Sequence, residues 1–536
     1  MKSLGDILAD QHISCTKKDI DALSVREIVI DSRKVSANSV FVAIKGLGLD
    51  GHDFIEQAIE NGCAAVVVDQ VWLAENKMET DVPVIGVPDS RVALGGMASR
   101  FYESPANEMT LIGITGTNGK TTTTYILENI ILQAGGNPGV IGTINYRFDG
   151  KELPAPHTTP EPVSLQKTLR AMADSGVTHV VMEVSSHALS QRRLEGVLFD
   201  IAVFTNLTRD HLDYHTDMES YFAAKMRLFT ESLKDSGHAV VLQDEAADGK
   251  NGIWSQRLID ELRRVNLKIN SSKTLHVMTC GTSKRADMWA EVRRSDVNGL
   301  CGTVYAQGKQ VEFDSHLVGE FNVQNILGAV GASLCLGVNE EDIGKGISGV
   351  ASVPGRMEKV RVAAGHDCVE RVAVFVDYAH SPDALENVLS TLHGLKHKRI
   401  IVVFGCGGDR DQGKRFLMGE IAGRLADLAV VTADNSRSEE PTDIMAEICR
   451  GLEAGGKTKS RIVGGRIEQQ GGYVAVVDRS EAINVALNSA AENDIVLVSG
   501  KGHENYQITN TGSIFFDDRQ EVRRCLENMR LENLPR

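Results

Sequence analysis

The stretch that most constrains the fold is TLIGITGTNGKTTTT, residues 110–124. A short apolar run at 111–114 predicts a buried strand, and 122–134 predicts a helix, so a glycine-rich turn joins strand to helix. The run Gly119-Lys120-Thr121 matches the end of G-x-x-x-x-G-K-[ST], a phosphate-binding loop, with five residues instead of four between it and Gly113. Glycines let backbone N–H groups turn onto a polyphosphate, and the helix N-terminus faces the same anion. The pattern predicts ATP or GTP binding with Mg²⁺, and an ordinary Gly/Thr turn is the weaker alternative.

Composition limits the classes of protein. The chain has 536 residues, of which 42% are hydrophobic and 24% charged, as in globular proteins with more than one core. A net charge of −15 without a basic block argues against a nucleic-acid partner. The chain has no signal-like N-terminus and no run of 18 apolar residues, so we expect no membrane span. Nine scattered cysteines without a C-x-x-C pair indicate reduced thiols. We expect a cytoplasmic monomer.

The pattern of apolar runs predicts an α/β protein of three domains, at 1–106, 107–352 and 353–536. Polar or proline-containing breaks, ESPANE and SVPGR, separate them. We expect strand and helix to alternate throughout the second domain around a mostly parallel sheet, because its apolar runs are continuous. The third domain is predicted to be Rossmann-like. The polar stretch 246–274 is predicted to be an insertion with a surface helix at 253–265.

Polar side chains follow two predicted strands of the second domain. Glu183 ends one strand, and the next is followed by TNLTRDHLDYH, which contains His211. A carboxylate at a strand end beside a phosphate loop is well placed to bind Mg²⁺. An exposed strand-end carboxylate is the ordinary alternative for either one alone, and Lys225 alone would be an ordinary solvated helix lysine.

Four loops of the third domain combine Arg, Glu, Asp and His at predicted strand ends. They are DYAHSPD, GCGGDRDQGKR, DNSRSEEP and GKGHE. Arg and Glu together can bind a substrate that carries both carboxylate and ammonium groups, which is the description of an amino acid. In the first domain, the turn 31–33 and the loop 45–52 could hold an anionic small molecule, although ordinary surface turns have the same composition.

These ordered motifs resemble the Mur ligases, the ATP-dependent amide-bond-forming enzymes of peptidoglycan precursor synthesis. The chain is most similar to the members that add the third amino acid to UDP-N-acetylmuramoyl-L-alanyl-D-glutamate. The resemblance covers nearly the whole chain except 246–274. It rests on GTNGKTTTT, MEVSSHALSQRR, TNLTRDHLDYH, the segment around Lys225, GEFNVQN, PGRME, DYAHSPDAL, GCGGDRDQGKR and GKGHENYQ.

The resemblance implies a role for each motif. Lys120, Glu183, His211, Lys225 and His380 are implied to be catalytic. The residues implied for the UDP-sugar-dipeptide are Ser32, Leu47, Gly48, Leu49, His157, Thr158, Thr159, Ser185, Gln191 and Arg193. Those implied for ATP are Gly116, Thr117, Asn118, Gly119, Lys120, Thr121, Thr122, Asn322, Asn325, Arg356 and Asp377. Those implied for Mg²⁺ are Thr121, Glu183, His211 and a carbamylated Lys225.

The incoming amino acid is implied to be meso-2,6-diaminopimelate. Family members that use it carry Asp-Asn-Pro-Arg, whose Arg grips the distal carboxylate, and this chain keeps the Arg but has Ser in place of Pro. A lysine substrate has no distal carboxylate, so an Arg there would face the wrong charge. Ser436 frees a backbone angle that proline would have fixed. The residues implied for this amino acid are Arg410, Asp434, Asn435, Ser436, Arg437, Gly500 and Glu504.

The implied reaction forms an acyl phosphate on the D-glutamyl γ-carboxylate, which the amine then attacks. We expect the third domain to rotate over the second so that the two reactants meet. The alternatives are the same reaction with L-lysine or another amino acid, a related ligase such as folylpolyglutamate synthase, a nucleotide-driven switch or motor, and a non-catalytic paralogue. A switch would leave Arg410, Arg437 and Glu504 unexplained, and a folylpolyglutamate synthase would have no need of the first domain.

Overall fold

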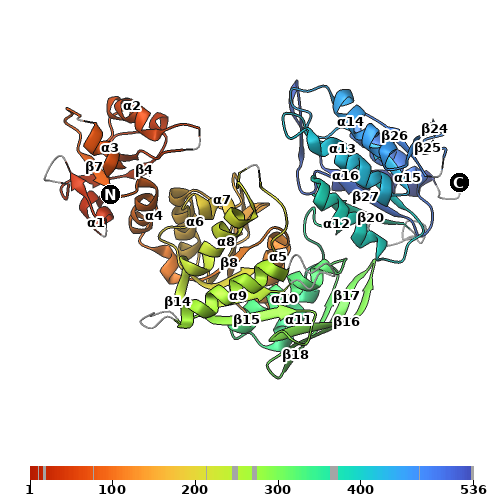
Figure 1. Cartoon of the computed structure of the whole chain (residues 1–536), viewed down its shortest axis with the longest axis horizontal. Helices are drawn as coiled ribbons and strands as arrows, with labels where there is room; N and C mark the ends of the chain where they lie inside the picture. The colour runs from red at the N-terminus through yellow and green to blue at the C-terminus, as the bar shows by residue number, and fades with distance from the viewer. Residues whose placement is uncertain are drawn as a thin grey trace. The chain divides into compact units, whose positions relative to one another are not determined.

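The computed structural model of the protein describes most of the chain, and Figure 1 shows it as a ribbon. The described residues are 1–9, 11–15, 20–46, 48–76, 78–212, 214–243, 252–267, 274–361, 372–469 and 471–532. Internal contacts divide the chain into two units. The first consists of Met1–Trp289, Tyr305–Lys309 and Asn325–Gly346, and the second of Ala290–Val304, Gln310–Gln324 and Ile347–Arg536.

The first unit begins with a five-stranded sheet of order β2-β7-β6-β5-β4. Strands β4 to β7 run parallel, and β2 pairs antiparallel with β7. Apolar clusters lie on both faces, as in a parallel sheet that helices cover. The strands are Ser14–Cys15 (β2), Glu27–Val29 (β4), Ser39–Val42 (β5), Ala65–Asp69 (β6) and Val84–Val87 (β7), with a separate pair Lys2–Ser3 (β1) and Ser24–Val25 (β3). The helices are Leu4–Leu8 (α1), Ile55–Glu60 (α2), Gln70–Glu75 (α3) and Ser90–Phe101 (α4), with 3₁₀ turns at Ser32–Lys34 (η1) and Gly51–Phe54 (η2).

A second, larger sheet carries the phosphate-loop segment, and its order starts β11-β10-β9-β12-β8-β13-β14-β15. Strand β8 lies between β12 and β13 and is parallel to both, which confirms the predicted buried strand. Its interior position sends the following loop to the carboxyl edge of the sheet, where ligands of such sheets collect. The strands are Thr110–Thr115 (β8), Pro138–Ile141 (β9), Asn145–Phe148 (β10), Lys151–Pro154 (β11), His179–Glu183 (β12), Phe199–Phe204 (β13), Leu233–Leu242 (β14) and His276–Gly281 (β15).

Helices cover this sheet, and the one after β8 confirms the predicted strand–loop–helix unit. They are Lys120–Gln133 (α5), Pro162–Asp174 (α6), Ser186–Ser190 (α7), Met218–Thr230 (α8), Gly252–Leu267 (α9), Phe321–Cys335 (α10) and Glu340–Ser348 (α11), with a 3₁₀ turn at Pro105–Glu108 (η3). Helix α9 is the helix predicted inside the 246–274 stretch, and it buries Leu258, Ile259 and Leu262 in the core. The rest of that stretch lies mostly outside the described residues.

The prediction that strand and helix alternate throughout the second domain is wrong at β9 to β11, which follow one another without a helix, and again near the end of the domain. Strand β15 is followed without a helix by Met288–Asp296 (β16), Gly299–Ala306 (β17) and Lys309–Ser315 (β18), which complete the sheet order. In β18 exposed and buried residues alternate, with Val311 and Phe313 buried. Such one-sided strands have no continuous apolar run, so a search for buried parallel strands passes over them.

The second unit contains a seven-stranded sheet of order β19-β20-β27-β21-β22-β26-β23. All neighbours are parallel except β19 and β20, which confirms the Rossmann-like prediction of an α/β sheet. The strands are Glu358–Lys359 (β19), Ala373–Asp377 (β20), Ile400–Phe404 (β21), Leu428–Val431 (β22), Thr458–Lys459 (β23), Gly472–Ala475 (β26) and Ile495–Ser499 (β27), with hairpins Ile462–Val463 (β24) with Arg466–Ile467 (β25), and Tyr506–Thr509 (β28) with Gly512–Phe515 (β29).

Two helices of this unit pack backbone against backbone. The helices are Pro382–His393 (α12), Gly413–Leu425 (α13), Pro441–Ala454 (α14), Arg479–Ser489 (α15) and Asp518–Glu532 (α16). A Cβ added to Gly419 of α13 would lie 2.1 Å from the Ile448 carbonyl oxygen, and one added to Gly451 of α14 would lie 2.1 Å from that of Phe416. The glycines therefore bring α13 and α14 together, and with them the polar loops that precede both helices.

Among the described residues, no helix is both long enough and apolar enough to cross a bilayer.

Candidate active site

The loop between β8 and α5 has a backbone that other residues adopt poorly. Gly116 and Gly119 have φ values of 150° and 89°. A Cβ on Gly116 would lie 1.8 Å from Oγ1 of Thr205, because the loop packs directly against the end of β13. The Asn118 N–H donates to Oδ1 of Asn206, at 2.9 Å. Glycines thus allow the backbone conformation of the loop, and contacts with residues after β13 hold the loop in place.

Two lysines point into this loop. Nζ of Lys120 donates to the carbonyl oxygens of Gly116 and Thr117, each at 2.8 Å. Nζ of Lys225, from α8, donates to the same Gly116 oxygen at 2.9 Å, and this side chain is 1% exposed. Burial and the nearby Lys120 ammonium lower the pKa of Lys225 well below its ordinary value. Lys225 is therefore not the solvated helix lysine that its position suggests.

Oxygen donors gather around Glu183 at the end of β12, which is 1% exposed. Its Oε2 accepts hydrogen bonds from Thr121, at 3.0 Å, and from Thr143, at 2.8 Å, and its Oε1 accepts from the Thr143 N–H at 3.0 Å. A carboxylate and a hydroxyl this close are ligands that suit Mg²⁺. Thr122, the next residue of α5, is buried.

His211 lies in a cluster of rings. It has a left-handed backbone, with φ at 55°, and its ring lies 5.0 Å from that of His187 and 6.0 Å from that of Tyr221. Tyr221 in turn contacts the loop through Oγ1 of Thr117, at 3.1 Å. Within the described residues, no three His, Cys, Asp or Glu side chains converge on one point that could hold a metal. The oxygen pair of Thr121 and Glu183 is thus the part of the predicted Mg²⁺ set that the structure brings into contact.

A polar network continues from Glu183 through the residues predicted for the muramoyl-dipeptide. Oγ1 of Thr159 donates to the Glu183 carbonyl at 2.8 Å and accepts the Ser185 N–H at 3.0 Å. The Arg193 guanidinium donates to the Thr159 carbonyl, at 3.0 Å, and to Oε1 of Gln191, at 2.7 Å. Oγ1 of Thr158 lies 3.1 Å from that of Thr143, and His157 is exposed, with its carbonyl accepting from Tyr146.

The residues predicted for the UDP group lie in two turns of the first sheet. Oγ of Ser32 donates to Oε1 of Gln57 at 2.6 Å, while Gly48 and Leu49 are exposed. Leu47 lies outside the described residues. Sequence reasoning missed Arg91, which donates to the Lys45 carbonyl at 2.7 Å and to that of Gln191 at 3.4 Å. No local motif marks Arg91, because it connects segments that are far apart in the sequence.

The two predicted adenine-side residues lie one turn apart on α10. A Cβ on Gly119 would lie 2.2 Å from Oδ1 of Asn325, so this side chain approaches the loop closely. Asn322 is buried and donates from Nδ2 to the Val318 carbonyl at 2.8 Å.

In the second unit, the end of β20 brings three of the predicted residues together. Asp377 is buried and accepts the N–H groups of Met357, at 2.6 Å, and Ala379, at 2.8 Å. Burial raises its pKa despite the nearby Arg356. The Arg356 guanidinium lies over the Tyr378 ring, 4.9 Å from its centre, and the His380 ring lies 4.5 Å from the same ring.

A second cluster in this unit contains most of the residues predicted for the amino acid. Nδ2 of Asn435 donates to Oε2 of Glu504 at 2.9 Å, and Nη1 of Arg437 donates to the carbonyl oxygens of Gly408, at 2.7 Å, and Asn435, at 3.3 Å. Arg437 has a left-handed backbone, with φ at 53°. A Cβ on Gly500 would lie 2.7 Å from Oδ2 of Asp434, Ser436 is buried, and Arg410 is exposed.

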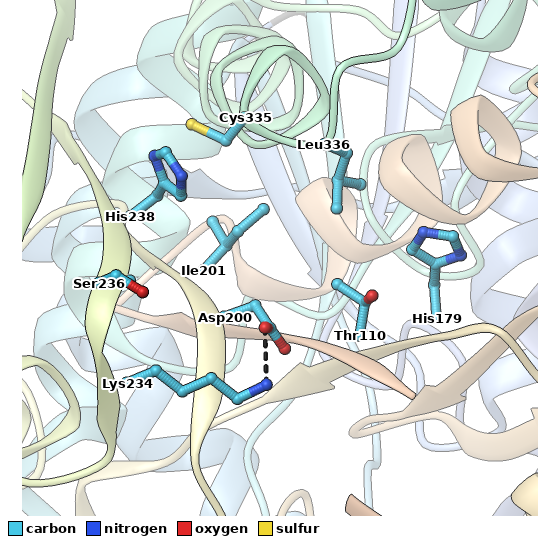
Figure 2. A pocket seen from close by; sticks show the side chains of 10 residues that line it. Thr110, His179, Asp200, Ile201, Lys234, Ser236, His238, Cys335 and Leu336 are labelled. Carbon is cyan, nitrogen blue, oxygen red and sulfur yellow. Dashed lines mark hydrogen bonds and ion pairs between the residues drawn. The ribbon is translucent and has the colours of Figure 1, made fainter. Parts of the chain in front are cut away.

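A cavity of about 320 Å³ opens at the opposite, amino edge of the central sheet. Figure 2 shows Lys234 and Asp200 paired in it, with His179, His238 and Cys335 around them. Lys234 and Asp200 are 2.7 Å apart, and Asp200 also accepts the Leu111 N–H at 2.9 Å. None of the residues that line this cavity belongs to the phosphate loop, so the cavity is separate from that loop.

The sequence matches three family models in order along the chain. They are "Mur ligase family, catalytic domain" over residues 24–102, "Mur ligase middle domain" over 114–333, and "Mur ligase, glutamate ligase domain" over 355–502. Two relatives are named UDP-N-acetylmuramoyl-L-alanyl-D-glutamate–2,6-diaminopimelate ligase. That of Geobacter sulfurreducens is 46% identical, over 93% of this chain and 94% of its own. That of Gloeobacter violaceus is 42% identical, over 96% of both chains.

The chain belongs to the Mur ligase family. A solved structure titled as the same diaminopimelate ligase is 30% identical, with a TM-score of 0.68 over 99% of this chain and 100% of its own. The predicted α/β, three-domain Mur ligase fold and the predicted ligase class are confirmed. A nucleotide-driven switch or motor is therefore excluded as the family of this chain, while the roles of the individual residues stay predictions.

Proposed function

We propose that this protein is an ATP-dependent ligase that joins meso-2,6-diaminopimelate to the D-glutamyl γ-carboxylate of UDP-N-acetylmuramoyl-L-alanyl-D-glutamate. The observation that carries the proposal is the pair of polar clusters in the two units. One combines a phosphate loop with Lys120, Lys225 and Glu183. The other holds Arg437 beside Asn435 and Glu504. The first suits phosphoryl transfer to a carboxylate, and the second suits an amino acid with charged groups at both ends.

The phosphate loop is proposed to hold ATP. Its N–H groups and Lys120 would bind the outer phosphates, after the Lys120 ammonium leaves the carbonyl oxygens of Gly116 and Thr117. Asn322 and Asn325 are proposed to contact the adenine. Arg356 and Asp377 are proposed to contact ATP from the third domain, with Asp377 toward the ribose. Thr121 and Glu183 fit Mg²⁺, with His211 and a modified Lys225 completing the proposed set. When bound, Mg²⁺ supplies positive charge that neutralises the transferring phosphoryl group.

Lys225 is proposed to carry a carbamate. Its burial and low pKa favour the neutral amine, which is the form that adds to CO₂ with release of a proton. The product is an anion with two oxygens, so a hydrogen-bond acceptor replaces the neutral amine beside the loop. The anion attracts the nearby Lys120 ammonium and gives an oxygen ligand for a metal.

In the first half of the reaction, the γ-carboxylate attacks the γ-phosphorus of ATP, and ADP leaves. Little acid–base chemistry is needed, because the step depends on placing a carboxylate in line with the phosphate and on positive charge around it. Arg193, Gln191, Thr158, Thr159 and Ser185 are proposed to hold the dipeptide, since their network ends at Glu183. Ser32, Leu47, Gly48 and Leu49 are proposed for the UDP group.

In the second half, the amine of diaminopimelate attacks the acyl carbon, a proton leaves the nitrogen, and phosphate departs from the tetrahedral intermediate. Arg437 and Arg410 are proposed to bind the distal carboxylate and Glu504 the distal ammonium. The Arg437 guanidinium is held by two backbone carbonyls, so its direction does not depend on the proline that related loops carry. Arg437 itself has a left-handed backbone, with φ at 53°. A proline at position 436 would fix its own φ and not that of Arg437.

The proposal is tested with single amino acids. The protein is incubated with ATP, Mg²⁺, UDP-N-acetylmuramoyl-L-alanyl-D-glutamate and one amino acid, and phosphate release and product mass are measured. We expect product with meso-diaminopimelate and at least 100-fold less with L-lysine, which has no distal carboxylate. Product with lysine alone would contradict the choice of amino acid, and phosphate release without the nucleotide sugar would contradict the ligase.

Arg437→Ala tests the proposed carboxylate contact. We expect the KM for diaminopimelate to rise at least 30-fold with the KM for ATP unchanged, because a charge-assisted pair is lost only at the amino-acid subsite. Arg424→Ala is the matched control, since Arg424 lies exposed on α13. An unchanged KM for diaminopimelate in Arg437→Ala would show that this arginine does not bind it.

A further inference from the structure

A fully buried lysine lies behind the proposed amino-acid subsite. Lys501 follows β27 and is 0% exposed. Its Nζ donates to Oδ1 of Asn435 at 3.2 Å, and it lies 3.6 Å from Oε2 of Glu504 and 3.8 Å from Oδ1 of Asp434. An ammonium without solvent access needs such partners, because an isolated buried charge is strongly destabilising. Lys501 thus contacts residues of the subsite from the protein interior and is not exposed to the substrate.

Lys501 and the Ile508 N–H together fix which way the Asn435 amide points. Oδ1 of Asn435 accepts from two donors, Nζ of Lys501 and the Ile508 N–H at 2.9 Å. Both partners donate, so a reversed amide would set its NH₂ group against them and lose both hydrogen bonds. The observed orientation leaves Nδ2 to donate to Oε2 of Glu504, at 2.9 Å. A chain of two hydrogen bonds therefore runs from Lys501 to the Glu504 carboxylate.

Lys501 also neutralises the carboxylates of the cluster. Burial raises the pKa of Glu504, whereas Lys501 and the Asn435 amide act in the opposite direction. Burial also disfavours the charged form of Asp434, yet Arg479 and Lys501 hold the pKa of that carboxyl below its ordinary value. The titratable and charged groups that face Glu504 are Lys501, Asp434, Arg479, Tyr378 and Tyr506.

Of the two cations in this set, Arg479 already forms an ion pair with Asp518. Its Nε and Nη2 each donate to a carboxylate oxygen of Asp518 at 2.7 Å, and both side chains are fully buried. Lys501, in contrast, lies 3.6 Å from Oε2 of Glu504. Loss of its charge would leave the half-buried Glu504 and the buried Asp434 with Asn435, which donates to Glu504 from its side-chain amide and to Asp434 from its backbone N–H. The like charges of the two carboxylates would then disfavour ionisation of both.

We propose that Lys501 is a positioning residue of the amino-acid subsite: through Asn435 it fixes the direction of the Glu504 carboxylate, and it supplies the positive charge that lets Glu504 meet the distal ammonium of the incoming amino acid as an anion. The inference rests on the proposed function, since it assigns Glu504 to that ammonium.

The test compares Lys501→Met with the wild-type protein. We expect the KM for meso-diaminopimelate to rise at least 10-fold while the KM values for ATP and the nucleotide sugar stay within twofold. We also expect the acid limb of kcat/KM for diaminopimelate to move to higher pH by about one unit, because Glu504 ionises less readily without the cation. Lys396→Met is the matched control, since Lys396 is an exposed lysine of the same unit.

Lys501→Gln is a second, milder variant for the case in which the Met variant does not fold. Glutamine keeps an N–H donor for Asn435 and lacks the charge, so it should move the acid limb fully and raise KM above that limb by less than the Met variant does. A wild-type KM and a wild-type acid limb in either folded variant would overturn the proposal.

A titration that does not depend on ligation separates this inference from the proposed function. In protein with ¹³C-labelled glutamate carboxyls, the Glu504 signal is identified as the one that Glu504→Gln removes. Its midpoint should lie at higher pH in the Lys501 variants, even in a protein that makes no product. An unchanged midpoint would overturn the role of Lys501, whereas wild-type protein that makes no product would contradict only the proposed ligase.

Discussion

Among single residues, two lysines beside the phosphate loop have the largest effect on the charge of the candidate active site. Lys120 and Lys225 donate to one carbonyl oxygen, that of Gly116. Lys120 is half-buried and can turn toward a ligand, whereas Lys225 is enclosed. Two ammonium groups at this distance repel each other, which is one cause of the low pKa of Lys225. The neutral amine is then available for modification near neutral pH.

The first prediction concerns CO₂. Degassed, bicarbonate-free protein should lose at least 90% of its ligase activity, and added bicarbonate should restore it, because the carbamate on Lys225 forms reversibly. Lys225→Met should lose activity more than 100-fold and gain none from bicarbonate. A ¹³C NMR signal of a carbamate after addition of ¹³CO₂, absent in Lys225→Met, checks the modification directly. Full activity without CO₂ would contradict it.

The second prediction concerns acid stability at His503. Burial, with nearby Arg356 and Arg519, lowers the pKa of His503 to about 4, and its Nδ1 is buried without a hydrogen-bond partner. Between pH 6.5 and 4 the unfolded chain therefore binds a proton that the folded chain does not, and stability falls as pH falls. The loss at pH 5 is about 2 kcal/mol.

His503→Phe keeps a ring against that of Tyr378, with the ring centres 5.0 Å apart in the wild-type protein, and removes the titration. Urea unfolding followed by circular dichroism at pH 7 and pH 5 should show a smaller acid loss in the variant, by about 2 kcal/mol. Equal losses in the two proteins would show that His503 is not the group responsible.

Individual roles depend on neighbours that the sequence does not display. The motifs were sufficient to predict that Glu183 and Thr121 belong together, because Glu183 ends one strand and Thr121 follows the loop after another strand of the same sheet. They could not show that Thr143 completes that contact or that Arg91 connects two distant segments. The enclosure of Lys501 was equally hidden, since the motif GKGHE does not show which of its side chains are buried.

At the scale of elements, the glycines of α13 and α14 control the amino-acid subsite. Gly419 and Gly451 let the helix backbones meet. The loops before these helices hold Arg410 and Arg437, and the buried Arg415, at the start of α13, pairs with Glu439 at 2.8 Å just before α14. The spacing between the helices therefore sets the spacing between the loops.

The third prediction follows from this packing. Gly419→Ala should destabilise the protein by about 1–3 kcal/mol, because its Cβ would meet the Ile448 carbonyl oxygen. It should also raise the KM for diaminopimelate at least fivefold by separating the loops. The control is Gly328→Ala in α10, where the nearest atom would lie 3.4 Å away and alanine should be neutral or slightly stabilising. Kinetics and urea unfolding measure both effects.

The elements that sequence reasoning predicted share one property. Strands such as β8, β13 and β21 are continuous apolar runs between parallel neighbours, so composition alone marks them. Strand β16 is half-exposed and β18 alternates between exposed and buried residues, and the two-residue strands β23 to β25 contain too few residues to form a pattern. Pairing partners define these elements, and a single sequence does not show partners.

At the scale of the whole molecule, the proposed reaction divides between the two units. The first unit contains the phosphate loop, Glu183 and the network that ends at Arg193, and the second contains the clusters around Asp377 and Glu504. Activation of a carboxylate and delivery of an amine are separate chemical tasks, so each unit can be assigned one. We expect the two units to come together once per turnover, a step that kinetics can detect.

The transfer of oxygen from substrate to phosphate tests the central claim most directly. UDP-N-acetylmuramoyl-L-alanyl-D-glutamate labelled with ¹⁸O in the γ-carboxylate is incubated with the protein, ATP, Mg²⁺ and meso-diaminopimelate, and the released phosphate is weighed by mass spectrometry. An acyl-phosphate intermediate predicts one ¹⁸O in each phosphate and one new amide per ADP. Phosphate without ¹⁸O, formed at the same rate when diaminopimelate is omitted, would contradict the account.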